Sequence, residues 1–177
     1  MENFGVGQAI SRFEDSRLLR GRGRFQDDRN LPDQTYAVAL RSPHAHARIV
    51  NVDTAAAKAA PGVLAVFTGA DYAAAGLGMP KAMMPRKRPD GAPMFAPQRP
   101  ALVVDRVRYV GAPVALIVAE TLSQAKDAAE MVGVDYEAVP AVTDAVDAAS
   151  LDAPAVWGEC PDNVSNIFEK RDKAATD

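Results

Sequence analysis

The sequence has few of the residue types that build metal centres and disulfides. It contains one cysteine, Cys160, and two histidines, His44 and His46, among 177 residues. A single cysteine cannot form an internal disulfide, so we expect a reducing compartment. No apolar run approaches the roughly 20 residues that span a bilayer, and residues 1–12 lack the features of a secretory signal. We therefore expect a cytoplasmic protein without membrane contact.

An excess of charge of either sign is also missing. Twenty Lys and Arg stand against 23 Asp and Glu, which gives a net charge of -3. This balance argues against non-specific binding to nucleic acid or anionic membranes. The 48% hydrophobic and 24% charged residues are typical of one globular domain. A domain of this length buries about 70% of the surface that its unfolded chain exposes, so its stability needs no cofactor.

Apolar periodicity predicts a protein of the α/β or α+β class. Six strands are expected, at residues 36–41, 47–53, 63–68, 106–110, 114–119 and 134–139. The fifth is a continuous apolar run, which is typical of a strand covered on both faces. The order of strand, helix and strand over residues 114–139 favours a crossover unit in a parallel or mixed sheet, and antiparallel pairing stays open.

Three helices are expected between these strands, each beginning at a candidate N-cap. The candidates are Asp53 or Thr54, Asp71, and Thr121 or Ser123. The helices should end at residues 61–62, at Gly76 and at Val132, respectively. The last helix should bury one face, formed by Ala125, Ala128, Ala129 and Val132.

Residues 76–100 interrupt this regular pattern with six prolines. Proline removes a backbone donor and fixes φ, so we expect a long irregular loop. A solvated surface loop and a binding loop, through the basic and apolar residues 81–88, both remain open. We expect this loop to be more mobile than the sheet. The periodicity weakens again near residue 150, which predicts a folded domain over residues 1–150 and a linker over residues 151–177.

The candidate metal and nucleophile residues are too few for a catalytic centre. His44 and His46 are two residues apart, so on a strand they would share one side, within reach of one metal ion. A zinc site needs three or four protein ligands, however, so a turn with exposed imidazoles is the favoured interpretation. Cys160 has no neighbouring base or cation in the sequence to lower the pKa of its thiol, so we expect an inert thiol.

The remaining motifs also fail as active sites. Gly5-x-Gly7 and Gly21-x-Gly23 neither follow a strand nor open a helix, as a phosphate-binding loop must. Alternation of glycine with arginine over residues 20–24 suits carboxylate or phosphate binding as well as a solvated segment. The arginines are Arg20, Arg22 and Arg24, and the isolated carboxylates are Asp27, Asp28, Asp71, Asp90, Asp135 and Glu137. No catalytic, cofactor-binding or metal-ligating residue is predicted.

Six motifs occur in a fixed order along residues 7–142. They are GQAISRFEDSRLLRGRGRFQDD (7–28), RSPHAHARI (41–49), PGVLAVFTG (61–69), DRVRYVG (105–111), PVA (113–115) and VDYEAVPAV (134–142). Together they resemble the N-terminal hammerhead domain of the molybdopterin-binding large subunit in the xanthine dehydrogenase, aldehyde oxidase and carbon monoxide dehydrogenase family. One position departs from the pattern, because Ala112 stands where Glu is frequent. The polar contact that a glutamate would make at this position is therefore in question for this chain, whereas the fold is not.

The resemblance implies a hammerhead fold, with a mixed sheet, covering helices and a long proline-rich loop. It also implies an oxidoreductase that hydroxylates an aldehyde, an N-heterocycle or a CO-type substrate at molybdopterin. Iron–sulfur clusters and FAD would lie on separate small and medium subunits. The pterin-binding loops and the catalytic glutamate of the family would follow Asp177, so no site residue carries over.

The role implied for this segment is a scaffold that is inactive alone, packs on the molybdenum domains and helps to seat the iron–sulfur subunit. Two alternatives stay open. One is a free-standing protein-interaction module without enzymatic activity, which would use the basic turn around His44 and the proline-rich loop. The other is an enzyme that uses His44 or His46.

Overall fold

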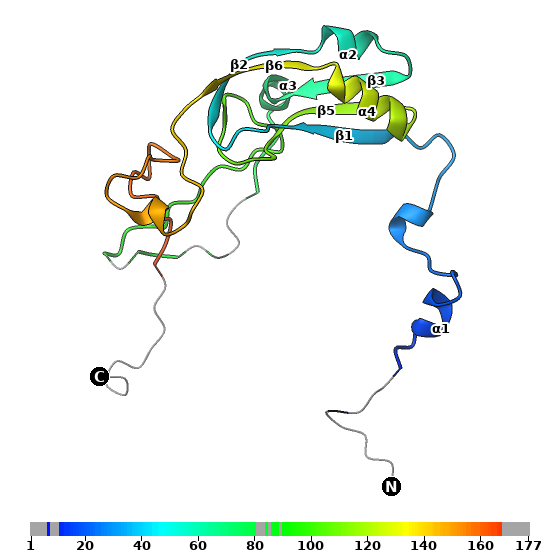
Figure 1. The fold of residues 1–177 in the computed structure, drawn as a ribbon, viewed down its shortest axis with the longest axis horizontal. Helices are drawn as coiled ribbons and strands as arrows, with labels where there is room; N and C mark the ends of the chain where they lie inside the picture. The colour runs from blue at the N-terminus through cyan, green and yellow to red at the C-terminus, as the bar shows by residue number, and fades with distance from the viewer. Residues whose placement is uncertain (1–6, 8–10, 81–83, 85, 89, 168–177) are drawn as a thin grey trace. The chain divides into compact units, whose positions relative to one another are not determined.

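The structure is a computed structural model that describes residues 7, 11–80, 84, 86–88 and 90–167 (Figure 1). Its contacts divide the chain into two units, Met1–Gln34 and Thr35–Asp177. The first unit contains the helix α1 (Asp15–Leu18) and the 3-10 helix η1 (Gln26–Asp28), and neither has a buried residue. No helix among the described residues is long and apolar enough to cross a membrane.

The second unit is built on two three-stranded sheets (Figure 1). The first has β5 (Pro113–Ala119) in its centre, with β1 (Tyr36–Arg41) and β3 (Val63–Thr68) at its edges. The second has β2 (Ala47–Asp53) in its centre, with β4 (Arg106–Val107) and β6 (Gly133–Ala138) at its edges. The predicted class of strands with covering helices is confirmed.

The sheet pairing corrects the expectation of a parallel or mixed sheet. All four strand pairs between described residues are antiparallel. The reason is that β5 and β6, which precede and follow the helix α4 (Leu122–Glu130), belong to different sheets. The helix therefore connects two sheets and does not return the chain to its own sheet. Periodicity predicts strands, but it does not say which strands are neighbours.

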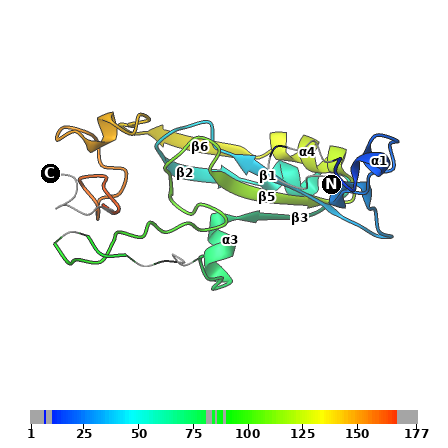
Figure 2. The same cartoon turned by 90° about the horizontal axis from the view of Figure 1, so that it is seen from below.

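The core lies mainly between the first sheet and α4. Ile117 is fully buried and pairs with Val38 on one side and Val66 on the other. Figure 2 shows α4 on one side of this sheet and α3 (Gly69–Ala74) on the other. The buried members of this cluster, which include the predicted helix face, are Ala57, Val66, Ala115, Ile117, Ala119, Ala125, Ala128, Ala129 and Val132.

A second, smaller core cluster belongs to the other sheet. Its buried members are Ala47, Val107, Ala112 and Val114. Val52 and Val134 pack against both clusters, so they join the two sheets. Ala112, the position that departs from the family pattern, is fully buried here. An alanine fits this apolar site, whereas a glutamate would need a buried partner for its charge.

The predicted helix caps are partly confirmed. Thr121 caps α4, and its hydroxyl accepts from the backbone N–H of Gln124. Thr54 precedes α2 (Ala55–Ala59) without a side-chain cap, and Asp53 instead accepts from the N–H of Ala55. Asp71 was expected to begin α3, but Thr68 caps that helix and the Asp71 carboxylate accepts from the N–H of Thr68. Thr68 and Asp71 thus form a capping box, in which the side chain of each residue accepts a hydrogen bond from the backbone N–H of the other.

The strand expected at residues 106–110 is shorter than predicted. Only Arg106 and Val107 pair with β2. Tyr109 and Val110 are exposed in a turn that ends at Gly111, whose φ is +88°. A positive φ is accessible mainly to glycine, so the chain leaves the sheet before the apolar run is complete.

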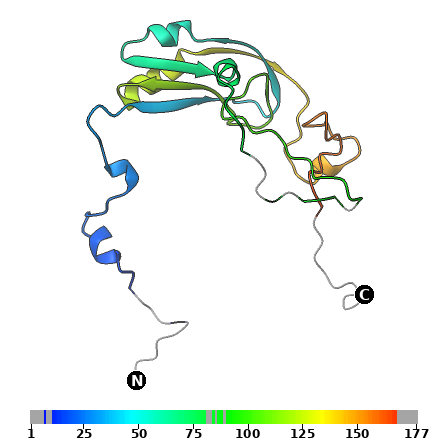
Figure 3. The same cartoon turned by 180° about the vertical axis from the view of Figure 1, so that it is seen from behind.

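The proline-rich loop and the chain after residue 150 lie side by side (Figures 1 and 3). In the loop, Lys87 and Pro93 form an antiparallel bridge around Gly91. Asn163 orders the following segment, since its side chain donates to the carbonyls of Ala148 and Pro154 and accepts from the N–H of Val156. Residues 81–83, 85, 89 and 168–177 lie outside the described residues, so the greater mobility of the loop and the linker over 151–177 stay predictions.

Candidate functional site

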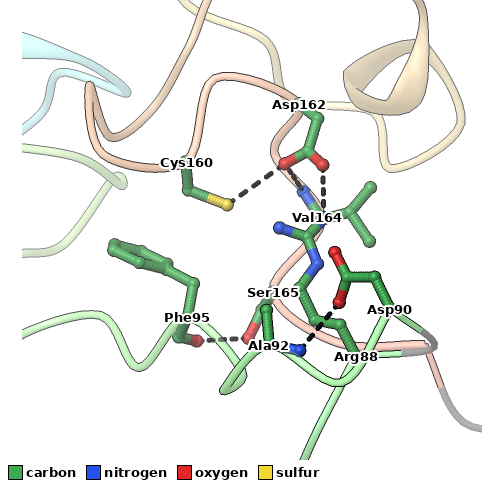
Figure 4. Close-up of polar contacts among 8 residues, drawn as sticks. All are labelled: Arg88, Asp90, Ala92, Phe95, Cys160, Asp162, Val164 and Ser165. Carbon is green, nitrogen blue, oxygen red and sulfur yellow. Dashed lines mark hydrogen bonds and ion pairs between the residues drawn. The ribbon is translucent and has the colours of Figure 1, made fainter.

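Polar contacts join the proline-rich loop to residues 157–165, which we call the tail (Figure 4). We call these contacts the loop–tail contact. Arg88 of the loop forms an ion pair with Asp162. The backbone N–H of Phe95 donates to the carbonyl of Ser165 over 3.0 Å, and the Ser165 hydroxyl donates to the carbonyl of Phe95 over 2.6 Å. These reciprocal bonds connect residues 70 positions apart. The loop is therefore held against the following chain by defined side chains.

Asp162 is the centre of this contact. Its Oδ1 accepts from the Val164 N–H at 3.1 Å and from the Cys160 thiol at 3.3 Å, while Oδ2 faces Arg88. The Val164 N–H and then the Arg88 guanidinium hold the pKa of the Asp162 carboxyl below its ordinary value. Burial, and after it the bond to Asp162, raises the pKa of the Cys160 thiol. Cys160 therefore stays protonated at neutral pH.

A groove of about 980 Å³ opens next to this contact, between α3, the loop, β4 and the tail. We call it the α3 groove, and its walls are mostly apolar or aromatic. Leu77, Met79 and Tyr109 contribute side chains that are 58%, 40% and 57% exposed, respectively. Exposed apolar side chains that gather around one hollow are typical of a surface that another chain covers.

Arg108 and Trp157 form the most ordered part of the α3 groove. The guanidinium carbon of Arg108 lies 3.7 Å from the centroid of the indole ring, and Phe95 packs against the same ring at 5.8 Å. Arg108 donates to the carbonyls of Val156 and Arg106. Burial lowers the pKa of this guanidinium, but arginine remains charged at neutral pH. Because no described carboxylate pairs with it, Arg108 keeps donors for an acceptor that enters the groove.

The two histidines do not form the exposed pair that was expected. His46 is buried, and its Nδ1 lies 2.8 Å from the carbonyl oxygen of Pro140. His44 is half-buried, and its ring packs against Tyr136 with centroids 4.7 Å apart. The expectation of exposed imidazoles is therefore wrong, because the turn folds back on β6 and the residues that follow it.

The motif around His44 holds two distant parts of the chain together. The backbone N–H of Ser42 donates to the carbonyl of Ala112, and the N–H of Gly111 donates to the carbonyl of Ser42. Arg41 donates from its side chain to the carbonyl of Gly111 over 2.9 Å. Motifs 41–49 and 105–111, which carry much of the resemblance, thus meet in space and have a structural role.

The other predicted candidates are scattered over the described residues. Arg20, Arg22 and Arg24 surround a hollow in the first unit, whereas Gly5 lies outside the described residues. Asp28 and Asp71 bind the backbone N–H groups of Phe25 and Thr68. Asp90 accepts from the N–H of Ala92, and Glu137 pairs with Arg48 on the sheet surface. Asp135 lies 3.5 Å from the side-chain amide of Asn51.

The described residues do not fit a molybdopterin site. No group of three or more His, Cys, Asp or Glu side chains lies close enough to hold a metal ion in this part of the chain. Among the described residues, the buried side-chain polar atoms without a partner are His46 Nε2 and Asn166 Oδ1. Two isolated atoms cannot bind a pterin and its phosphate, so no chemical step is assigned to these residues. That the whole sequence holds no catalytic, cofactor or metal residue stays a prediction.

Sequence reasoning did not find the residues of the loop–tail contact. Arg88, Asp162 and Ser165 lie in segments without apolar periodicity, so no pattern links them. Trp157 could have been found from the sequence, because a lone tryptophan in a polar segment usually packs against other side chains. Its partners become visible only in the folded chain.

Comparisons with known proteins agree on one family. The model of the family described as "Aldehyde oxidase and xanthine dehydrogenase, a/b hammerhead domain" matches residues 20–140. The large subunit of nicotine 6-hydroxylase from Paenarthrobacter nicotinovorans is 40% identical over 159 residues, which are 90% of this chain and 19% of that protein.

This chain is also similar to one part of several longer proteins of solved structure. Quinoline 2-oxidoreductase from Pseudomonas putida 86 matches with a TM-score of 0.72 and 39% identity, over 84% of this chain and 18% of that one. The Cu,Mo-CO dehydrogenase in its carbon monoxide reduced state matches with a TM-score of 0.69 and 34% identity, over 94% of this chain and 20% of that one. This chain spans about a fifth of the length of these proteins.

Proposed function

Because this chain belongs to the a/b hammerhead domain family of aldehyde oxidase and xanthine dehydrogenase, we propose that it is a structural domain of a molybdenum hydroxylase large subunit, inactive alone. The observation that carries the proposal is the family match over residues 20–140 of a chain that spans a fifth of its relatives. In the whole enzyme, molybdopterin supplies the redox chemistry for hydroxylation of an aldehyde, an N-heterocycle or a CO-type substrate.

The α3 groove is the surface that this role assigns to the rest of the large subunit. Leu77, Met79 and Tyr109 leave apolar area in water, and covering it would stabilise the assembled protein by about 25 cal/mol per Å². Arg108 adds a charged donor that lies against an aromatic ring. Aromatic residues and arginine are enriched at the energetic centres of interfaces.

The loop–tail contact gives this surface its shape. It holds Phe95 beside Trp157, and both residues line the groove. A wall that is ordered before association loses less entropy when a partner binds. The residues of this chain thus bind and position a neighbouring domain, and they do not touch the reacting atoms.

The proposal extends to partners and location. We expect iron–sulfur clusters on a small subunit, FAD on a medium subunit and molybdopterin in the remainder of the large subunit. The complex is proposed to be cytoplasmic.

Metal analysis of the purified 177-residue chain tests the proposal. We expect a folded protein without molybdenum that does not turn over an aldehyde or a purine. Stoichiometric molybdenum together with turnover by this chain alone would overturn the proposal. A native gene product of about 18.8 kDa, and not several times that mass, would instead favour a free-standing interaction module.

A further inference from the structure

The first sheet has an apolar face that belongs to neither core cluster. Side chains alternate along β5, so Ile117 packs toward α4 while its neighbours Leu116 and Val118 lie on the opposite face. The strand pairing places two residues of β1 and two of β3 beside them. We call this surface the outer face of the first sheet. Its residues, none of which is part of either core cluster, are Ala37, Ala39, Ala65, Phe67, Leu116 and Val118.

The outer face is continuous and uncharged. The register forms two rows across the sheet, each with one β5 side chain between an alanine of β1 and a residue of β3. Leu116 and Val118 are half-buried, and Phe67 is 46% exposed. The helix α3 lies on this side of the sheet, where β3 ends, and still leaves much of Phe67 in water (Figure 2).

The second sheet shows what a water-facing surface looks like in this fold. The outward residues of β2 and β6 are polar, since Arg48 pairs with Glu137 and the Asn51 amide lies 3.5 Å from Asp135. Such alternation is typical of an antiparallel sheet with one face in water. The outer face of the first sheet lacks it. The continuous apolar run of β5 is typical of a strand covered on both faces, so the outer face is expected to be covered in the mature protein.

The size and composition of the outer face favour a cover from the same polypeptide. Interfaces between separate proteins contain polar groups and about 20 or more residues on each side. The outer face has six residues, three of them alanine, and no polar side chain. It is therefore too small to hold a separate subunit or a second copy of this chain. It suffices for a domain of the same chain, because the covalent connection gives that domain a high effective concentration.

Charge argues against the first unit as the cover. Residues 11–34 contain six arginines and five carboxylates among 24 residues. Packing this segment on the outer face would remove charged groups from water without offering them a partner. An uncharged, apolar element fits the outer face better.

We propose that an uncharged, apolar element in the remainder of the same large subunit covers the outer face of the first sheet. Phe67, Leu116 and Val118 supply most of the contact area. The short side chains of Ala37 and Ala39 let the covering element approach β1 closely. The inference rests on the proposed function, since it needs a large subunit that is longer than this chain.

Photo-cross-linking identifies the covering element. A variant with p-benzoylphenylalanine in place of Phe67 keeps an aromatic ring at this exposed site, and near-ultraviolet light joins its ketone to C–H groups within reach. In the assembled enzyme, we expect the cross-linked peptide to come from the large subunit outside residues 1–177. The cross-linked large subunit should keep its monomeric mass on a denaturing gel.

Two controls accompany this measurement. The same photoreactive residue in place of Val50, an exposed site on the second sheet, should form no cross-link to protein. In the isolated 177-residue chain, the Phe67 variant should form no cross-link to residues 1–34.

Charge on the outer face supplies a second test. In the isolated chain, A37E/F67E should unfold at nearly the urea concentration of the wild type, because both residues are exposed. In the whole enzyme, the same variant should lower the recovery of soluble large subunit at least fivefold, because covering would bury two carboxylates without partners. The control V50E should change neither value.

The identity of the cross-linked peptide separates the possible occupants. A cross-link from position 67 to residues 1–34, to a separate subunit or to a second copy of the large subunit overturns the inference and leaves the proposed function intact. An enzyme that forms no cross-link and tolerates A37E/F67E has the same meaning. A native gene product no longer than this chain, which purifies without other domains, overturns the proposed function and the inference together.

Discussion

Cys160 shows how burial and one polar neighbour together determine the reactivity of a side chain. The sequence alone predicts an inert thiol because no base or cation is adjacent to it. In the structure the thiol is buried and donates to Asp162, and both effects raise its pKa. The thiol is therefore protected by the loop–tail contact, although Arg88 lies close enough to act in the opposite direction.

The variant D162N should increase the reactivity of Cys160. Removing the carboxylate lowers the pKa of the thiol, so more thiolate is present at neutral pH. Labelling should become faster, although by less than the thiolate fraction increases, because a thiolate of lower pKa is a weaker nucleophile. The rate of reaction with a chromogenic disulfide reagent measures this change, since Cys160 is the only cysteine.

Two variants serve as controls for this measurement. C160S gives the background rate. D144N removes another carboxylate with a lowered pKa, one that binds the N–H groups of Val146 and Asp147. An equal rate for D162N and the wild type would show that Asp162 does not protect the thiol.

At the scale of elements, helix caps can be compared within one chain. Thr121 accepts a hydrogen bond from Gln124, whereas the side chain of Thr54 makes no cap at the start of α2. T121A should lower the free energy of unfolding by about 1 kcal/mol, and T54A by less than about 0.5 kcal/mol. Urea unfolding followed by circular dichroism measures both values. Equal losses would contradict a capping role for Thr121.

Two glycines give a similar comparison between elements. A Cβ at Gly69, the first residue of α3, would clash with the backbone carbonyl of Val103, whereas a Cβ at Gly78 would meet open space. G69A should therefore cost about 1–3 kcal/mol of stability. G78A should change stability by no more than about 0.5 kcal/mol. A G69A protein as stable as the wild type would contradict this close approach of α3 to residue 103.

The elements also show which parts of the fold were predictable. The strands were found because apolar residues repeat along each of them, and the face of α4 was found by its helical spacing. The pairing of β6 with β2 was not predictable, because it depends on where α4 directs the chain. Asn163 was missed for a related reason, since its three hydrogen bonds join segments 7 to 15 residues apart that become neighbours only on folding.

At the scale of the whole molecule, the family motifs contribute both to the interior and to the α3 groove. Ser42, Gly111 and Ala112 meet in the interior of the second unit and make backbone contacts. The α3 groove combines Arg108 and Tyr109 of the motif 105–111 with residues of the loop and the tail, where apolar periodicity is weak. The fold was therefore easier to predict than this groove, which forms only where segments distant in the sequence meet.

The α3 groove can be tested without disturbing the fold. Y109E and L77E place a charge where we propose an apolar contact, so association with the rest of the large subunit should weaken about tenfold, which corresponds to about 1.4 kcal/mol. Both residues are exposed, so the isolated variants should unfold at nearly the urea concentration of the wild type. V50E, at an exposed site on β2 outside the groove, is the control.

Trp157 gives the groove a built-in optical reporter, because it is the only tryptophan in the sequence. Indole emission depends on the polarity around the ring and on charged groups in contact with it. Arg108 and Phe95 pack against this ring, and one edge of the groove is formed by it. A neighbouring domain that excludes water there should shift the emission to shorter wavelength, so association could be followed in real time without attaching a dye.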